Sequence, residues 1–356
     1  MLEMVSCWYK QRFSDPHAVS LAAILVFGFI IIYFFGNLIA PLLVAMVLAY
    51  LLEWPVVNLS RLGISRTLSV VLVILIFTSL MLMAVFGLVP TIWQQVGNFT
   101  NDVPNMYIGL QNFVSIVPKR YPELANLQIV ELLIANIKNQ VIAVGESILK
   151  GSVASLLSIA TLVVYLVLVP ILVFFLLKDK QEMISIVTVV LPKNRKLANK
   201  VWYEMNDQIS NYIRGKVLEI LIVGGISYVA LAVLGLRYAV LLSVAIGFSV
   251  LVPYIGAAVV TVPVAIIGLF QWGLTPQFYW LMLIYSSIQT LDGNILVPVL
   301  FSEAVNLHPV AIISSVLVFG GFWGFWGVFF AIPLATLVKA VWNVLSNHDE
   351  DVSAEE

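Results

Sequence analysis

Asp292 is an acidic residue within apolar sequence, and two amides lie close to it. Gln289 comes three positions before it and Asn294 two positions after it, and no basic residue lies within ten positions on either side. An ionisable residue at membrane depth is costly and usually handles a substrate or an ion. A carboxyl with two amides could exchange a proton, hold a monovalent cation or hydrogen-bond a polar solute. Asp292-Gly293 is also a turn signal, so the acid could instead cap a helix, and the amides could bind local backbone.

Three further candidates lie elsewhere in apolar sequence. Pro253 and Gly256 predict a break in a helix, and broken helices near the bilayer centre often form binding sites in secondary transporters. Glu219 lies three residues after Lys216, so an ion pair with Lys216 or Arg214 at the membrane interface is an alternative to a binding role. We predict no catalytic residue and no metal ligand. The predicted substrate- or ion-binding residues are Asp292, Gln289, Asn294, Pro253, Gly256 and Glu219.

Most of these candidates belong to a nearly chargeless C-terminal part of the chain. Tyr238 to Leu291 holds 54 residues without Asp, Glu, Lys, Arg or His. One membrane pass needs about 20 apolar residues, so this stretch predicts two or three passes. Pro and Gly interrupt it, and such breaks free backbone groups that lipid cannot satisfy. We therefore expect the breaks to line a cavity or to be covered by protein.

The composition indicates a membrane protein. Of 356 residues, 61% are hydrophobic and 10% are charged, against about 25% charged in a globular protein. We predict an all-α fold: a polytopic helical membrane protein with about seven to nine membrane segments, some broken or re-entrant, and a helical extracytoplasmic insertion. The net charge of −1 gives no reason to expect nucleic-acid binding, and Cys7, the only cysteine, excludes an intramolecular disulfide.

The sequence contains no motif that indicates catalysis or a cofactor. It has no Gly-x-x-x-x-Gly-Lys phosphate-binding loop, so it has no ATPase of its own. It also has no His-Glu-x-x-His motif and no two acids placed alike in two spans. We therefore expect neither an enzyme nor a cofactor, and an ion gradient would drive any transport.

The distribution of charges divides the chain into segments. Ala18 to Leu52 suits two short helices joined near Gly36-Asn37, and Leu68 to Val89 suits a third helix that ends at Pro90. We expect no cleaved signal peptide, because the polar N-terminus lacks a small-residue cleavage site. The predicted order is a cytoplasmic N-terminus (1–17), three transmembrane helices (18–90), an extracytoplasmic helical segment (91–151), a transmembrane helix (152–177), a basic cytoplasmic segment (178–216), a C-terminal transmembrane core with broken helices (217–346) and an acidic disordered tail (347–356).

Positive charges in short loops predict the orientation. The N-terminus, the loop with Arg61 and Arg66, and the segment from Lys178 to Lys216 carry most of these charges, and we expect all three in the cytoplasm. A cytoplasmic C-terminus would make Ala304 to Val338 a hairpin that turns near Gly320 to Gly327. A single tilted span would instead place the C-terminus outside.

A heptad-like seam lies in the predicted extracytoplasmic segment. Apolar residues there alternate in spacing between three and four positions, which indicates a helix with one apolar stripe. The stripe could pack on the protein itself or on the membrane surface, or it could form a contact between subunits. Its members are Leu127, Val130, Ile134, Ile137, Val141, Val144 and Ile148.

A series of short motifs runs along almost the whole chain. They are Arg61 to Arg66, Leu176 to Asp179, Tyr212 to Lys216, Pro253 to Gly256, Gln289, Asp292-Gly293, Pro298, Leu307 to Pro309, Gly320 to Gly327 and Ile332 to Leu334. In the order and spacing of these motifs the chain resembles the autoinducer-2 exporter (PerM-like permease) family of bacterial membrane proteins. Lys216, where a Gln is common in the family, and Glu303, where small residues are usual, depart from the pattern. The resemblance implies a multi-pass inner-membrane protein of a secondary-transport type, linked to autoinducer-2 export or to sodium/proton exchange, and ring-like homo-oligomers such as pentamers.

These observations lead to one functional prediction and two alternatives. We predict a secondary transporter of the bacterial inner membrane that exports a small polar solute, such as autoinducer-2, driven by an ion gradient. A monovalent cation/proton antiporter is the first alternative. A non-transporting membrane scaffold, which would hold partners with its external helix and its basic segment, is the second. The expected partners are the lipid bilayer, a small polar solute or monovalent cation, and further copies of the same chain.

Overall fold

The computed structural model describes residues 16–120, 155–190, 196–253, 255–301 and 307–339. These residues form helices joined by turns, and none of them forms a strand. The elements, in order, are α2 (Pro16–Arg61), α3 (Arg66–Arg120), α5 (Ser155–Lys178), α6 (Lys180–Val190), α7 (Lys196–Val233), α8 (Ala239–Ser249), α9 (Ile255–Trp272), α10 (Pro276–Leu291), the π-helix η2 (Asp292–Leu296), α11 (Val297–Phe301), α12 (Pro309–Trp323) and α13 (Phe325–Phe329).

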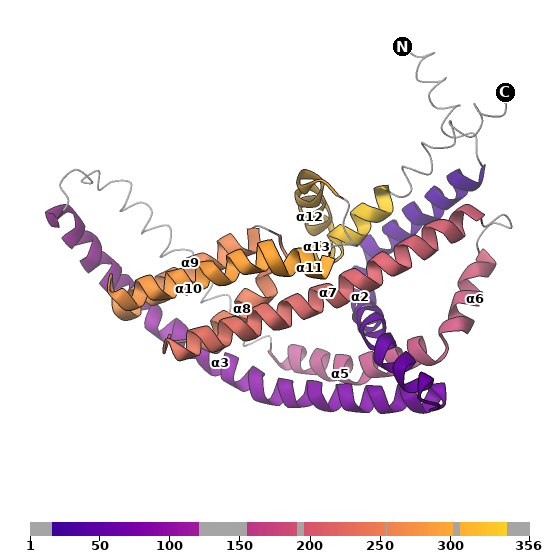
Figure 1. Ribbon diagram of the computed structural model, residues 1–356, viewed down its shortest axis with the longest axis horizontal. Helices are drawn as coiled ribbons and strands as arrows, with labels where there is room; N and C mark the ends of the chain where they lie inside the picture. Colours follow the sequence, from indigo (N-terminus) through magenta and orange to yellow (C-terminus); the bar gives the residue numbers. More distant parts are fainter. Residues whose placement is uncertain (1–15, 121–154, 191–195, 254, 302–306, 340–356) are drawn as a thin grey trace, which may run out of the picture.

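Several of these helices can cross a membrane. Within the described ranges, 4 are long and apolar enough: Leu38–Arg61, Arg66–Asp102, Asn206–Val233 and Ile255–Trp272. Shorter apolar helices accompany them at Val164–Lys178, Ala239–Ser249 and Pro309–Trp323. Figure 1 shows α3 and α7 running along the length of the molecule, with α10 beside α7 and α9 beside α10. The prediction of an all-α polytopic membrane protein is therefore confirmed.

The N-terminal membrane segment differs from its prediction. Instead of two short helices joined near Gly36-Asn37, α2 is one helix of 46 residues with Pro41 and Pro55 inside it, and it changes direction along its length (Figure 1). A loop within lipid would leave backbone groups without hydrogen-bond partners, whereas a helix bent at proline keeps nearly all of them satisfied. The predicted separation into two helices is wrong for this reason.

The helix that follows also continues past its predicted end. α3 spans 55 residues and passes through Pro90. The hydroxyl of Thr91 donates to the Gly87 carbonyl at 2.9 Å, the kind of side-chain bond that helps membrane helices tolerate proline. At about 1.5 Å per residue α3 is roughly 80 Å long, well beyond the bilayer core of about 30 Å. The segment predicted to be extracytoplasmic thus begins as a direct extension of a membrane helix, and the heptad-like seam lies outside the described residues.

The predicted basic segment and the membrane helix that follows it share one helix, and the predicted boundary between them stays a prediction. α7 is continuous from Lys196 to Val233 and so joins the two. Lys216, expected just before a span, lies within the candidate span Asn206–Val233. α7 contains no Pro, and no Gly before Gly215, so nothing in the local sequence breaks the helix ahead of Lys216.

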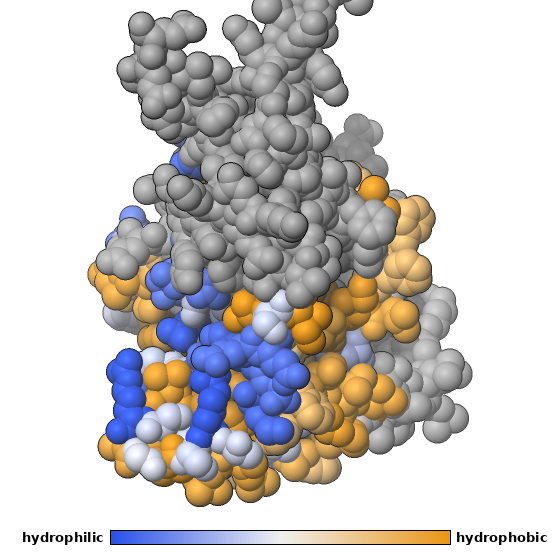
Figure 2. Space-filling view, turned by 90° about the vertical axis from the view of Figure 1, so that its right-hand side faces the viewer, coloured by the Kyte–Doolittle hydropathy of each residue, from blue (hydrophilic) through white to orange (hydrophobic). Residues whose placement is uncertain are grey.

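At one end of the molecule, side-chain contacts connect the two basic turns that the sequence predicts to be cytoplasmic. Arg66 donates from Nη2 to the Leu177 carbonyl at 2.9 Å, at the C-terminal end of α5, where a positive charge is favourable. Glu53 accepts from Lys180 at 3.2 Å and lies 3.5 Å from Arg66. Figure 2, which faces this end, shows hydrophilic residues gathered beside apolar ones. The arrangement puts both basic turns on the same side of the helices.

A second polar network lies at the other end, between the C-terminal half of α3 and the turn after α7. The hydroxyl of Tyr238 donates to Asp102 at 2.5 Å, and Arg237 lies 3.6 Å from the same carboxylate. Gln95 accepts from the Leu241 N–H at 2.9 Å. Burial, reinforced by the Asp102 carboxylate, raises the pKa of Tyr238 to about 12, so its phenol keeps its proton and donates at neutral pH. These bonds attach the extension of α3 to the C-terminal helices.

Glycines allow the C-terminal helices to pack closely. A Cβ on Gly247 of α8 would lie 3.0 Å from the Ile220 carbonyl of α7, so the two backbones nearly touch. α12 ends at Gly324, whose φ of 57° is a conformation that glycine adopts readily. α13 then packs back on α12, since a Cβ on Gly327 would lie 1.8 Å from the Phe319 carbonyl. The predicted turn between Gly320 and Gly327 is confirmed.

Candidate functional site

Asp292 lies where the helical chain changes from an α- to a π-type pattern. Its φ and ψ are both −58°, and the N–H of Val297 bonds to its carbonyl, five residues back. The chain thus makes no Asp-Gly turn here, which removes the capping alternative considered for this residue. Gly293 and Pro298 weaken the regular helix around it. Single-turn π segments within α-helices occur frequently at functional sites.

Two polar atoms near this junction have no hydrogen-bond partner among the described residues. They are Oδ1 of Asp292 and Nε2 of Gln289, and both are buried. The two residues are three apart along the helix, which places them on one face. A buried polar atom without a partner typically costs about 1–3 kcal/mol. Oδ1 of Asp292 could accept a proton, a cation or a donor of a polar solute, and Nε2 of Gln289 could donate to an acceptor of that solute.

α7 brings an ion pair to the same place. Nζ of Lys216 lies 2.7 Å from Oε2 of Glu219, and the two side chains are 5% and 2% exposed. The ammonium also lies over the Phe301 ring of α11, 5.3 Å from its centroid. Asp292 interacts electrostatically with both members of the pair. We call Lys216, Glu219, Gln289 and Asp292 the polar cluster.

The predicted pairing of Glu219 with Lys216 is observed. Both side chains are buried in the helix packing, and the location of the pair at the membrane interface stays a prediction. The continuity of α7 carries both residues into the span. Lys216 was therefore missed as a site residue, although its spacing of three from Glu219 was visible in the sequence and predicts one face of a helix.

The remaining candidates do not join the polar cluster. Asn294 is exposed, and its amide donates to the Thr290 carbonyl at 2.8 Å. Asn294 therefore binds local backbone, as in the alternative to a binding role given above. Pro253 lies in the turn between α8 and α9, so the predicted helix break is confirmed. Gly256 is buried, and a Cβ there would lie 1.7 Å from the Ser249 carbonyl. Gly256 thus permits a close backbone approach, and its predicted binding role stays a prediction.

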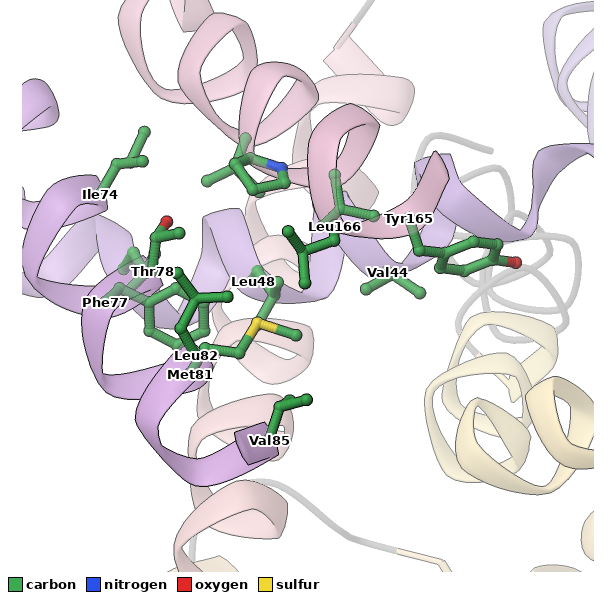
Figure 3. Close-up of a pocket in the computed structure, with 14 residues that line it drawn as sticks. Val44, Leu48, Ile74, Phe77, Thr78, Met81, Leu82, Val85, Tyr165 and Leu166 are labelled. Atoms are coloured by element: carbon green, nitrogen blue, oxygen red, sulfur yellow. The ribbon is translucent and has the colours of Figure 1, made fainter. Parts of the chain in front are cut away.

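An apolar pocket lies apart from the polar cluster, between α2, α3 and α5 (Figure 3). Leu48, Phe77 and Val169 are among the residues that line it, and Thr78 and Tyr165 add the only hydroxyls among its lining residues. Such walls offer little to a polar solute. Among the residues that the structure describes, no three His, Cys, Asp or Glu side chains gather as metal ligands. The polar cluster is therefore the better candidate site.

Comparisons with known proteins agree with a transport role. The sequence profile of the family described as AI-2E family transporter matches residues 22–347. The chain is 54% identical to PerM of Escherichia coli (strain K12), a proposed permease, over 96% of this chain and 97% of that protein. It is 27% identical to YueF of Bacillus subtilis (strain 168), a proposed transport protein, over 87% and 84% of the two chains. The match covers most of the chain, membrane helices and polar cluster included, and the chain therefore belongs to the AI-2E transporter family.

Proposed function

We propose that this protein is a secondary transporter of the bacterial inner membrane that exports a small polar solute of the autoinducer-2 type, driven by an ion gradient. One observation carries the proposal: Asp292 and Gln289 hold buried polar atoms without partners beside a buried Lys–Glu pair, within apolar helices. A site of this kind combines a titratable group with hydrogen-bonding groups for a solute. The family and its permease-like relatives favour transport over catalysis.

A monovalent cation/proton antiporter is the second candidate. It is favoured by the two carboxyls of the polar cluster, Glu219 and Asp292, which interact electrostatically across α7 and η2. Two neighbouring acids can share one proton or hold one cation. On this alternative the polar cluster would handle ions alone, without an organic solute.

Transport by reconstituted protein tests both candidates. Purified protein in phosphatidylethanolamine–phosphatidylglycerol vesicles is assayed with labelled autoinducer-2, with and without a pH gradient, and ion movement is followed with a pH-sensitive dye. Gradient-dependent movement of the labelled solute supports the export function. Ion exchange without solute movement supports the antiporter, and a wild-type protein that moves neither leaves the scaffold alternative.

Asp292→Asn is the decisive variant, because it keeps the size of the side chain and removes its titration. We expect the variant to fold but to lose pH-dependent transport. Asn294→Asp is a matched control that adds a carboxyl two positions away, where the side chain is exposed and bonds its own helix. An Asp292→Asn protein with the wild-type rate and pH profile would show that Asp292 is not part of the transport site.

A further inference from the structure

Lys216 is the unusual member of the polar cluster, because it is a cation buried within an apolar helix. Only 4% of the residue is exposed. Burying an ammonium is costly unless charges and hydrogen bonds compensate it. The Glu219 carboxylate at 2.7 Å and the Phe301 ring at 5.3 Å provide this compensation. Asp292, within electrostatic reach, is a second acid for the same ammonium.

The neighbouring elements add few other charges around Lys216. Arg214 lies two residues before it, a spacing that directs the guanidinium to another side of α7. The hydroxyl of Tyr212 donates to the Phe329 carbonyl, and that of Tyr50 on α2 donates to Asn206. On α10, the Tyr285 hydroxyl bonds the Ala257 carbonyl of α9. α8, α11 and α13 carry no titratable residue.

The charges of the polar cluster therefore do not cancel. One ammonium stands against two carboxylates, so the cluster has one negative charge in excess when both acids are ionised. Lys216 compensates Glu219 in the structure, and Oδ1 of Asp292 has no hydrogen-bond partner among the described residues. One further positive charge completes the balance, and it must enter beside an ammonium that repels cations.

We propose that Lys216 is a built-in counter-ion that occupies the place of a metal cation in the polar cluster, so that the ion coupled to transport is the proton. This inference rests on the proposed function and names its coupling ion. A proton satisfies the excess charge by bonding to a carboxylate oxygen, which requires no coordination shell. Sodium or potassium would need several oxygen ligands at a point where the Lys216 ammonium is already present.

The position of the ammonium then depends on whether Asp292 carries a proton. With a proton on Asp292, Lys216 stays with Glu219 and the cluster is neutral. When Asp292 releases this proton to water, its carboxylate competes with Glu219 for the ammonium. One proton is taken up and one is released per cycle, and the lysine keeps its charge throughout. Because η2 packs against α7, a change in the protonation of Asp292 acts directly on the contact between these helices.

Cation binding to purified protein tests the inference separately from transport. Thermal unfolding in detergent is measured in sodium, potassium and choline chloride at equal ionic strength. We expect the wild-type Tm to be the same in all three salts. The double variant Lys216→Gln/Glu219→Gln replaces the ion pair by two amides that can bond each other and leaves Asp292 without an ammonium. Sodium or potassium should raise its Tm by about 2 °C or more at tenfold excess over the dissociation constant.

Two controls identify the residues responsible. Adding Asp292→Asn to the double variant should abolish the response to sodium, and Lys216→Arg, which keeps the charge, should show none. A wild-type protein stabilised specifically by sodium would overturn the inference while leaving a transport function, with the antiporter favoured. A folded double variant that ignores both cations would overturn it as well. If the double variant does not fold, the wild-type comparison decides alone. Failure of the proposed function would appear instead as wild-type vesicles that move neither solute nor ions.

Discussion

The pair formed by Lys216 and Glu219 shows how position within a helix changes the energetic role of a residue. A salt bridge at the surface contributes little, because water solvates both charges almost as well. Inside the helix packing neither charge has that alternative, since the two side chains are 5% and 2% exposed. The loss of one partner is then expected to cost more than the pair itself contributes, because the remaining charge stays buried.

Removal of one partner from this pair should destabilise the protein strongly. We expect Glu219→Gln to cost roughly 3–5 kcal/mol of folding free energy, and Lys216→Met/Glu219→Leu to cost less than that single change. Thermal unfolding in detergent, analysed as a double-mutant cycle, measures both. Asp179→Asn breaks the exposed pair with Lys178 and should change stability by less than about 1 kcal/mol. Equal stabilities for Glu219→Gln and wild type would show that Glu219 is not ionised in the folded protein.

At the scale of the helices, glycines determine where backbones meet. Gly327 brings α13 against the end of α12, and Gly247 brings α8 against α7. Other glycines have open space around them, among them Gly225 in α7 and Gly321 in α12. The sequence does not distinguish the two groups, because the need for a glycine depends on a neighbour that is distant in the chain.

Alanine substitutions distinguish the two groups of glycines. Gly327→Ala would place a methyl group 1.8 Å from the Phe319 carbonyl, so α12 and α13 must separate. We expect a loss of about 1–3 kcal/mol, read as a lower Tm and a lower yield of folded protein. Gly321→Ala, in the same helical hairpin with nothing within 4 Å of the new methyl group, should be neutral or slightly stabilising. Similar losses for both variants would contradict the packing of α13 on α12.

At the scale of the whole molecule, polar networks hold both ends of the helices. Arg66, Glu53 and Lys180 join the turns at one end. Asp102, Tyr238 and Arg237 tie the extension of α3 to the C-terminal helices at the other. The helices between the two networks are apolar, as contact with the hydrocarbon of the bilayer requires. The networks lie at the helix ends, where water or lipid headgroups could solvate them.

The orientation in the membrane follows from which end carries the basic turns. We expect Arg61 to face the cytoplasm and Asn101 to lie outside, because positive charge in short loops is retained on the cytoplasmic side. Both positions are exposed, so each can be replaced by cysteine in a Cys7→Ser background. A membrane-impermeant maleimide should label Asn101→Cys in intact cells and Arg61→Cys only after the inner membrane is permeabilised. The opposite pattern would invert the topology.

We also predict that the protein is a homo-oligomer. Exposed apolar side chains and close helix contacts mediated by small residues are typical of membrane subunits that pack together. Mass measurement in mild detergents, corrected for bound detergent, should exceed the 39.4 kDa of one chain. A monomer in every detergent tested would contradict this prediction.

The sequence by itself determined the class of the protein and identified Asp292 as a candidate site residue. A low content of charge and a chargeless stretch of 54 residues require a helical membrane protein, since lipid leaves backbone groups no partner outside the helix. Asp292 stood out for the same reason, as an acid that apolar surroundings do not solvate. The helix breaks at Pro253 and near Gly324 were predictable too, because proline and glycine act on the local backbone.

The tertiary structure decided how those residues combine. Pro41 and Pro90 end no helix, because satisfying the backbone within lipid outweighs the local cost of a proline. Asp292 comes to Lys216 and Glu219 only through the packing of η2 and α11 on α7, more than 70 residues away along the chain. Local propensity carries no information on such a contact, and neither a heptad pattern nor a turn pattern predicts it. The packing also buries the Lys216–Glu219 pair, and charge interactions strengthen where water is excluded, so the pair becomes the centre of the candidate site.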